Sequence, residues 1–537
     1  MPSKTELNLK KSGGVHYTPT VLAEFLAGQI SKCVSIKSPD VLDPACGDGA
    51  LLRAICREMP GAKVSGFDLD DSALTAARLA VNGKFLKADF LSYVLEGKRM
   101  GSQGHPPVAA YDVVIANPPY VRTQVLGSVR SKKIADQFGL NGRVDVYHAF
   151  LDGIADVLRP GGVAGVIVSN RFMTTKAGET IRARMLEKYD ILHVWDLGDT
   201  KLFSAAVLPA VLLLRKKTGA ASPHPAMSAI YAADGVANCT ASSPIEALDR
   251  TGLVSVGKQC FMVEHGKLDY SKGIWRISSD SIDEWLRVVS KNTFCSFGDI
   301  GKIRVGIKTT CDKVFVRHTW PKPRPNLLRP LLNHKVARCY KALPAELHVL
   351  YPHDESSGKR YAVNLDLFPA DKAYLESNRE ILEKRKYVIE GGRKWYEIWV
   401  PHKPSSWKRP KLVFPDISVK PTFWMSLGGE VVQGDCYWLQ AEDEDLLWLA
   451  LAVANSSFIE KFYDYSFNNK LYSGRRRFMT QYVEKFPIPD PRSSLAKSIV
   501  LAAKKIYELT PSSSAEKLRV DLELKVERAF GLKDAVR

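Results

Sequence analysis

The chain has 537 residues, enough for two or three domains, and 45% of them are hydrophobic, as in globular proteins with substantial cores. Lysine and arginine outnumber aspartate and glutamate by 76 to 58, and the net charge of +18 favours a polyanionic partner such as nucleic acid. The nine cysteines form no CxxC pair or Cys/His cluster, which argues against a zinc site or a disulfide framework. With no signal peptide and no long apolar run, we expect reduced thiols, no bound metal, no membrane partner and a cytoplasmic, nucleoid-associated location.

Residues 1–220 alternate between short β-branched runs and helical stretches. The runs at 40–43, 63–69, 85–89, 111–117, 163–169, 191–197 and 210–216 are predicted strands, and the stretches at 20–33, 48–58, 71–81 and 145–159 are predicted helices. Such alternation predicts an α/β fold with a doubly wound, Rossmann-like sheet.

Four of these strands end in an acidic or polar residue. The residues are Asp43, Asp68, Asp89 and Asn117. Ligands of doubly wound sheets bind at the carboxyl ends of the strands, so we expect these four side chains to converge on one site.

A glycine-containing loop follows the first predicted strand, in VLDPACGDGALL at 41–52. Glycine lets the backbone approach a ligand closely, and the N–H groups of the helix start can bind a carboxylate. We therefore expect Asp43, Ala45, Cys46 and Gly47 to contact a ligand.

The next two strand ends suit a nucleoside. Asp68 lies about 20 residues beyond the glycine loop, where a carboxylate can accept both hydroxyl protons of a ribose, and Leu69 can cover an adenine face. Asp89 is placed to accept from an adenine amino group, with Phe90 as a second apolar wall.

The most informative motif is Asn117-Pro118-Pro119-Tyr120, which follows the apolar strand YDVVIA. The two prolines fix the chain and remove two N–H donors. The Asn117 side-chain oxygen and the Pro118 carbonyl can then accept the two hydrogens of a planar amino group and aim its lone pair at an electrophile. Tyr120 can stack on the ring that carries this amino group.

These motifs resemble the gamma group of DNA amino-methyltransferases, the TaqI-methylase-like enzymes of bacterial type II restriction–modification systems. The resemblance covers most of 14–217 and implies S-adenosylmethionine as methyl donor, S-adenosylhomocysteine as product, double-stranded DNA as substrate and N6 of a flipped-out adenine as target. A separate cognate restriction endonuclease is a possible partner. The sequence of the motif, DPACGDG, differs from the one most common among methyltransferases.

The resemblance also implies roles for residues outside these motifs. Tyr17 and Thr18 in YTP match a cofactor motif, with Thr18 at the methionine end, and Phe150 is a cofactor neighbour. Phe203 would stack on the flipped base opposite Tyr120. Phe172 and Tyr147 are the substitutes if Tyr120 and Phe203 do not stack.

The breaker-rich segment 218–228 and the change of pattern after it predict the domain organisation. We expect a catalytic domain at 1–220, a connecting segment at 221–295, a mixed α+β target-recognition domain at 296–490 and a helical element at 491–537. Basic and aromatic residues interleave at 393–411 and 468–478, a composition that suits DNA contacts.

Four alternatives are weighed against this prediction. The same amino-group chemistry serves enzymes that methylate RNA or a protein glutamine, and also the amino group of cytosine. A fused nuclease would need room ahead of Tyr17 that the chain does not offer. A non-catalytic DNA-binding protein would not need the intact motif at 117–120. Methylation of a cytosine ring carbon needs a cysteine nucleophile after a proline, and none is found in that context.

Overall fold

The computed structural model describes residues 18–102, 110–120, 128–140, 145–203, 208–219, 225–271, 273–467, 471 and 474–532. These residues form two compact units. The first unit runs to Asp280 and the second begins at Ser281, apart from residues 471 and 474, which group with the first unit.

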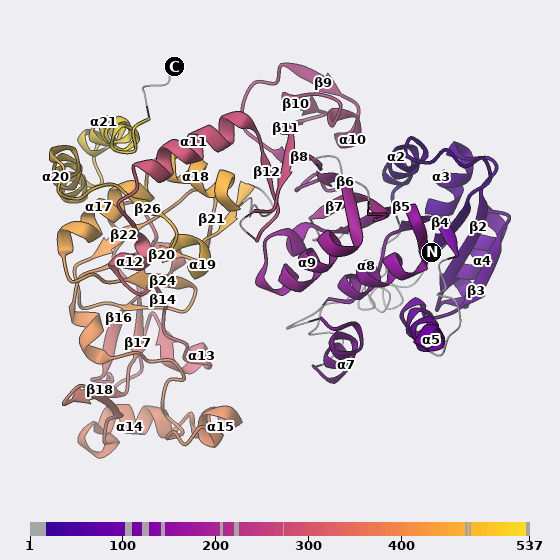
Figure 1. The fold of residues 1–537 in the computed structure, drawn as a ribbon. Helices are drawn as coiled ribbons and strands as arrows, with labels where there is room; N and C mark the ends of the chain where they lie inside the picture. The colour runs from indigo at the N-terminus through magenta and orange to yellow at the C-terminus, as the bar shows by residue number, and fades with distance from the viewer. Residues whose placement is uncertain are drawn as a thin grey trace. The chain divides into compact units, whose positions relative to one another are not determined.

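The first unit is built on one 12-stranded sheet with the order β3-β2-β1-β4-β5-β7-β6-β8-β11-β10-β9, and β12 pairs with β11 (Figure 1). Its strands are β1 (Asp40–Asp43), β2 (Lys63–Asp68), β3 (Lys84–Lys87), β4 (Tyr111–Ala116), β5 (Leu158–Ser169), β6 (Tyr189–Asp196), β7 (Pro209–Lys216), β8 (Ala226–Ala232), β9 (Cys239–Ala241), β10 (Gly252–Val256), β11 (Gln259–Asp269) and β12 (Arg276–Ser278).

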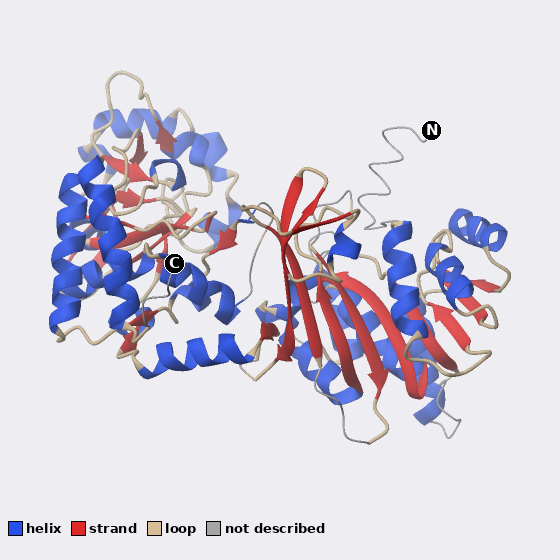
Figure 2. Ribbon diagram, turned by 90° about the horizontal axis from the view of Figure 1, so that it is seen from above, coloured by secondary structure: helices blue, strands red, loops and turns tan. Residues whose placement is uncertain are grey.

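Helices lie against this sheet (Figure 2). They are α2 (Thr20–Ser31), α3 (Ala50–Glu58), α4 (Asp71–Ala80), α5 (Phe90–Ser102), α7 (Ser128–Phe138), α8 (Val146–Val157), α9 (Glu179–Lys188) and α10 (Pro244–Ala247). Buried side chains of α2, α3, α4 and α10 form one core cluster with the sheet, and those of α7, α8 and α9, with the first turns of α5, form another. The two clusters are the two layers of a doubly wound fold, so the predicted fold class is confirmed.

The predicted strands agree with the observed ones to within a few residues, and their directions define the functional edge. β3, β2, β1, β4 and β5 are parallel, whereas β7 is antiparallel to both β5 and β6. The carboxyl ends of β1, β2, β3, β4, β5 and β6 therefore lie along one edge of the sheet.

Local sequence explains how two of the helices start. The Asp70 side chain caps α4 by accepting from the amide of Ser72 at 2.9 Å. Gly49 precedes α3 with φ of +81°, and a Cβ there would lie 3.2 Å from the Cα of Ala77. Glycine thus permits both the turn into α3 and the close approach to α4.

The region predicted as a connecting segment at 221–295 largely continues the sheet. β8 pairs in parallel with β6 from His193↔Ala226 to Asp196↔Ala229, and β11 pairs antiparallel with β8. The breaker-rich segment at 218–228 joins β7 to β8 within one unit, and the division between units falls at Asp280 instead.

The second unit is a mixed α+β structure with several small sheets. Its strands are β13 (Cys295–Ser296), β14 (Arg304–Val305), β15 (Val316–Arg317), β16 (Leu328–Leu332), β17 (Leu347–Leu350), β18 (His353–Ser356), β19 (Lys359–Ala362), β20 (Lys411–Pro415), β21 (Ile417–Ser418), β22 (Trp424–Ser426), β23 (Val431–Val432), β24 (Cys436–Leu439), β25 (Arg476–Arg477) and β26 (Pro487–Ile488). Its helices are α11 (Asp280–Lys291), α12 (Phe297–Ile300), α13 (Asp312–Phe315), α14 (Pro369–Glu376), α15 (Arg379–Glu383), α16 (Lys386–Glu390), α17 (Glu444–Ala454), α18 (Ser457–Phe467), α19 (Thr480–Val483), α20 (Ser494–Leu509) and α21 (Ser513–Ala529).

The core of the second unit is rich in tryptophan. Trp407, Trp424 and Trp438 are fully buried between the sheets β14-β24-β20-β22 and β15-β17-β16-β23. The predicted helical element at 491–537 contains α20 and α21, which pack on each other and on α17. Among the described residues, no helix is long and apolar enough to cross a membrane.

Candidate functional site

Asp43, Asp68 and Asn117 meet the expectation that they share one edge of the sheet. Asp43 and Asp68 are the last residues of the parallel neighbours β1 and β2, and Asn117 directly follows β4, the other neighbour of β1. Asp89 follows β3, which pairs in parallel with β2. The order β3-β2-β1-β4 places all four at adjacent strand ends.

The glycine loop is held against β2 by backbone hydrogen bonds. The Cys46 amide donates to the Phe67 carbonyl at 2.8 Å, and the Gly47 amide donates to Asp68 Oδ2 at 2.9 Å. Gly66 makes this close approach possible, because a Cβ there would lie 2.8 Å from Cys46 Sγ. The loop and Asp68 therefore form one connected structure.

Asp43 is buried within this loop. Its Oδ1 accepts from the Ala45 amide at 3.1 Å. Burial, and then the charges of Asp68 and Asp48, raise the pKa of Asp43 to about 8, although the Ala45 amide opposes the shift. A neutral Asp43 at physiological pH would shape the loop without repelling a ligand carboxylate. Burial likewise raises the pKa of the Cys46 thiol, so this cysteine is not a reactive thiolate.

Gly47 turns the loop at a point that is open to a ligand. Its φ is +51°, and a Cβ added there would have no heavy atom within 4 Å. Beside it, Asp68 Oδ1 accepts from the Asp70 amide at 2.9 Å, and Leu69 is 61% exposed. An exposed leucine next to an anchored carboxylate fits the predicted pairing of an adenine face with a ribose.

The side chains of Asp89, Phe90 and Phe150 make contacts within the protein itself. Asp89 caps the first turn of α5, since its carboxylate accepts from the Leu91 amide at 3.3 Å and from the Ser92 hydroxyl at 2.8 Å. Phe90 and Phe150 are 1% and 5% exposed, and their ring centroids are 5.1 Å apart. Both rings belong to the core beneath the site.

The motif at 117–120 forms a hydrogen-bonded group with Thr18. Asn117 Nδ2 donates to Thr18 Oγ1 at 3.0 Å, and the Tyr120 hydroxyl donates to Asn117 Oδ1 at 2.8 Å. These contacts orient the Asn117 amide, with its oxygen on the Tyr120 side. Pro118 is buried, whereas Asn117, Pro119 and Tyr120 are half-buried. The motif thus joins the predicted cofactor residue Thr18 to the predicted catalytic residue Asn117.

The aromatic residues expected to stack on a flipped base do not lie together in one core cluster. The Tyr120 ring lies edge-on to buried Tyr147, with centroids 6.2 Å apart. Phe203 is 7% exposed and belongs to the core cluster of α2 and α3, whereas Tyr120 packs against the cluster of α5 and α8. Phe172 is fully buried. Tyr17 lies outside the described residues.

A buried polar cluster next to the site was not singled out from the sequence. Asn170 follows β5, and its Nδ2 donates to Asp196 Oδ1 at 3.0 Å, while the Tyr231 hydroxyl donates to Asp196 Oδ2 at 2.6 Å. Asn170 and Asp196 carry the same signal as Asn117, a polar residue that ends or follows an apolar strand. The partner Tyr231 lies on β8, which the sequence analysis placed in a connecting segment.

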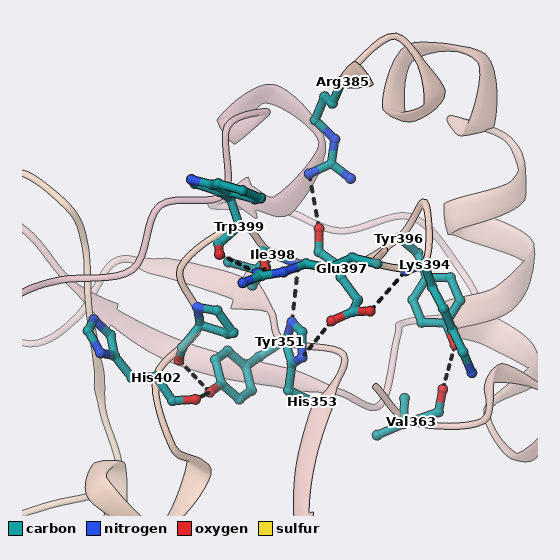
Figure 3. A network of polar contacts seen from close by, with 12 residues as sticks. Tyr351, His353, Val363, Arg385, Lys394, Tyr396, Glu397, Ile398, Trp399 and His402 are labelled. Atoms are coloured by element: carbon teal, nitrogen blue, oxygen red, sulfur yellow. Dashed lines mark hydrogen bonds and ion pairs between the residues drawn. The ribbon is translucent and has the colours of Figure 1, made fainter. Parts of the chain in front are cut away.

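In the second unit, buried Arg385 holds together two segments, residues 308–310 and residues 394–402. Its guanidinium donates to the Glu397 carbonyl at 3.0 Å (Figure 3). It also donates to the carbonyls of Thr309 at 2.9 Å and Trp395 at 2.5 Å. A backbone bridge between Lys308 and Val400 connects the same two segments.

Further side chains fix the segment 394–402 along its length (Figure 3). Tyr396 donates to the Val363 carbonyl at 2.7 Å, Tyr351 donates to the Pro401 carbonyl at 2.6 Å, and the Ile398 amide donates to His353 Nε2 at 3.1 Å. Burial lowers the pKa of His353 to about 3, so the ring is neutral and its Nε2 is an acceptor. These contacts fix the backbone of the aromatic segment 394–402 at several points along its length.

Comparisons with known proteins agree with this geometry. A family model described as Eco57I restriction-modification methylase matches residues 65–203. The Type II methyltransferase M.BanIII of Aneurinibacillus aneurinilyticus is 37% identical over 569 residues, which covers 97% of this chain and 98% of that protein. A release factor glutamine methyltransferase of Moorella thermoacetica is 30% identical over 162 residues, covering 28% of this chain and 52% of that protein.

A solved structure also resembles the whole chain. The Type IIL restriction-modification enzyme MmeI, in complex with DNA, has a TM-score of 0.63 at 14% identity, covering 100% of this chain and 76% of that one. At this identity the likeness shows the fold. The relationship to M.BanIII spans both units at a level that shows family membership. The chain therefore belongs to the methyltransferases of Type II restriction–modification systems.

Proposed function

We propose that this protein transfers a methyl group from S-adenosylmethionine to the exocyclic N6 of an adenine in double-stranded DNA. The observation that carries the proposal is the group formed by Thr18, Asn117 and Tyr120 at the carboxyl end of β4. It presents an oriented amide oxygen beside an aromatic ring, next to a loop suited to a nucleoside.

The chemistry follows from the weak nucleophilicity of an aromatic amino group, whose lone pair is delocalised into the ring. Asn117 Oδ1 and the Pro118 carbonyl would accept the two amino hydrogens and direct the lone pair toward the methyl group. These hydrogen bonds strengthen as the nitrogen gains positive charge, so they stabilise the transition state more than the ground state. Tyr120 keeps Asn117 Oδ1 in place through its hydroxyl.

The residues around Gly47 fit the methyl donor. Gly47 would allow the donor to approach the loop backbone, Asp68 would accept from its ribose hydroxyls, and Leu69 would cover its adenine. The donor supplies an electrophilic methyl group. Thr18, hydrogen-bonded to Asn117, would lie at the methionine end, close to the acceptor site.

The second unit would bind DNA through its basic and aromatic surface. Residues 384–411 hold nine lysines and arginines but only two glutamates, so this segment supplies +7 of the net charge of +18. Five lysines in and beside the segment are exposed and, within the part of the chain that the structure describes, have no carboxylate within 4.0 Å. They are Lys308, Lys386, Lys394, Lys403 and Lys408. Such side chains are free to neutralise phosphates.

The target base must leave the duplex to meet Asn117, because its amino group is otherwise paired and stacked. Tyr120 is the proposed stacking partner. A sandwich with Phe203 would require this buried ring to leave its core cluster, so we propose Tyr120 as the principal contact.

Methylation of RNA or of a protein glutamine is the alternative. The similarity to the glutamine methyltransferase covers 28% of the chain, whereas the similarity to M.BanIII covers 97% of it and includes the second unit. Methylation of RNA or of a glutamine would leave the second unit without a proposed role, so the DNA proposal accounts for more of the chain. A separate cognate endonuclease would complete the restriction–modification system.

The test is mass spectrometry of nucleosides from duplex DNA incubated with the protein and labelled S-adenosylmethionine. We expect N6-methyl-2′-deoxyadenosine as product at one recognition sequence, located by methylation-sensitive sequencing. Replacing Asn117 with Ala should lower the rate by two to three powers of ten, since one lost transition-state acceptor costs roughly 3–4 kcal/mol. Label in cytosine, RNA or glutamine, with none in adenine of DNA, would contradict the proposal.

A further inference from the structure

Two loops leave the edge of the sheet that carries Asn117, and both are attached to the strands that extend the sheet beyond β6. One loop, residues 170–178, follows β5, and the other, residues 197–203, follows β6. β4, β5 and β6 run in the same direction, so these loops leave the edge that carries Asn117. The second loop contains Phe203.

Asp196 is the centre of the first attachment. This carboxylate is 0% exposed and accepts from the Asn170 amide group at 3.0 Å, the Gly198 backbone amide at 3.2 Å and the Tyr231 hydroxyl at 2.6 Å. It therefore joins the start of both loops to β8. Burial and the charges of Asp196 and Asp199 raise the pKa of Tyr231, so its hydroxyl stays protonated as a donor.

The turn after β6 packs closely against the backbone of β8. Gly198 has φ of +47°, and a Cβ there would lie 2.2 Å from the Ile230 carbonyl oxygen. Asp199 accepts from the Ala232 amide at 2.8 Å. Only glycine allows this contact, and together the two interactions fix the chain that leads to Phe203.

The first loop has a second attachment near β12. The Trp275 amide donates to the Met173 carbonyl at 2.9 Å, and the Trp275 ring lies 5.3 Å from that of Phe172. Buried Arg182 donates to the carbonyls of Phe172, Thr175 and Gly273, at 2.5, 2.9 and 2.9 Å. The guanidinium of Arg182 thus connects the loop at 170–178 to Gly273, which precedes β12.

From these contacts we infer that residues 226–278 act as a brace for the two loops beside the methyl-transfer site, with Tyr231 as its principal positioning residue. The inference rests on the proposed function only in taking the carboxyl edge at Asn117 as the place where the target base binds. Tyr231 does not touch the reacting groups. It fixes the position of Asp196, and Asp196 in turn fixes the first residues of both loops.

Tyr231→Phe removes only the hydroxyl, and Tyr189→Phe is its matched control. Tyr189 is equally buried, and its hydroxyl donates to the Leu151 carbonyl at 2.8 Å, but it begins β6 at the opposite edge of the sheet. Tyr189→Phe loses one buried hydrogen bond, whereas Tyr231→Phe loses two, the one donated to Asp196 and the one accepted from Asn170 at 3.2 Å. Both variants should therefore be less stable than wild type, Tyr231→Phe more so. Only Tyr231→Phe should loosen the loops beside Asn117.

The first measurement is hydrogen exchange of the full-length protein, which needs no activity. We expect faster amide exchange in 170–178 and 197–203 for Tyr231→Phe and no change there for Tyr189→Phe. The second measurement is single-turnover methyl transfer to duplex DNA. We expect Tyr231→Phe to be slower by about tenfold, the loss of one hydrogen bond to a charged group, with unchanged affinity for S-adenosylmethionine and with Tyr189→Phe at the wild-type rate.

Equal exchange in the two variants would overturn the brace, and so would equal transfer rates in an active enzyme. A wild-type protein that fails to methylate adenine in DNA would contradict the proposed function instead. The exchange experiment would still decide whether Tyr231 holds the two loops.

Discussion

Tyr120 has two proposed roles that one pair of substitutions separates. Its hydroxyl donates to Asn117 Oδ1 at 2.8 Å, and its half-buried ring is the proposed stacking surface for the target base. Tyr120→Phe keeps the ring and removes the hydrogen bond, whereas Tyr120→Ala removes both. The two variants differ from each other by the stacking contribution alone.

The expected magnitudes follow from these contacts. A single hydrogen bond contributes roughly 1 kcal/mol, so Tyr120→Phe should slow methyl transfer by about fivefold as Asn117 loses its fixed orientation. Stacking of a base on an aromatic ring contributes about 1–3 kcal/mol. Tyr120→Ala should therefore lose roughly 2–4 kcal/mol in total, or about 30- to 1000-fold in rate.

Two duplexes measure the two effects: single-turnover methylation of the adenine-containing duplex gives the transfer rate, and binding of a duplex with 2-aminopurine in place of the target adenine, which has no N6 amino group to methylate, gives the fluorescence change on flipping. Tyr120→Phe should keep the fluorescence increase that accompanies flipping but transfer the methyl group more slowly. Tyr120→Ala should lose most of the fluorescence increase as well. If the two variants have the same rate and the same fluorescence, the ring does not stack on the base and the assignment is refuted. A Tyr120→Phe protein with the wild-type rate would instead refute the role of the hydroxyl.

Three further predictions concern the donor, the loop and DNA. Asp68→Ala should weaken binding of S-adenosylmethionine by about 1.5–3 kcal/mol, because the ribose loses a charged acceptor, and unchanged calorimetric affinity would move the donor site elsewhere. The raised pKa of Asp43 means that the folded state keeps a proton that the unfolded chain releases, so this group costs stability as the pH rises from about 4 to about 8. Asp43→Asn should therefore raise the melting temperature, relative to wild type, more at pH 8 than at pH 5; an equal difference at both would contradict the shift. For DNA, log affinity should fall linearly with log salt concentration, and Lys394→Ala should reduce the slope by about one, while Lys384→Ala, which removes a lysine paired with a glutamate at 2.7 Å, should change it little.

Much of the catalytic half is predictable from the sequence because its signals are local. Strands such as β4 are β-branched runs bounded by polar or breaker residues, and their order in the chain implies parallel neighbours with ligand residues at their ends. The positions of Asp68 and Asn117 at strand ends were predicted in this way. The contact of Asn117 with Thr18 joins residues 99 positions apart, and only the resemblance connected them beforehand.

The remaining features depend on tertiary packing that local patterns do not encode. An aromatic residue such as Phe203 has the same sequence signal whether it faces a ligand or a core. Likewise, the local sequence of β8 does not indicate whether this strand pairs with β6 or starts a new domain. Its pairing depends on which edge of the folded sheet is free. Asp196 lies within the predicted strand at 191–197, but its contact with Tyr231 could not be predicted from the sequence.

The continuity of the sheet through β8 decides where this chain can be divided. Cutting at residue 220 would leave the backbone of β6 from His193 to Asp196 without its neighbour and expose a free edge that invites aggregation. A division near Ser281, where the two units separate, keeps every strand of the large sheet with its partners. Chimeras that exchange the second unit between relatives should therefore be joined at the start of α11, so that the whole 12-stranded sheet is inherited as one piece.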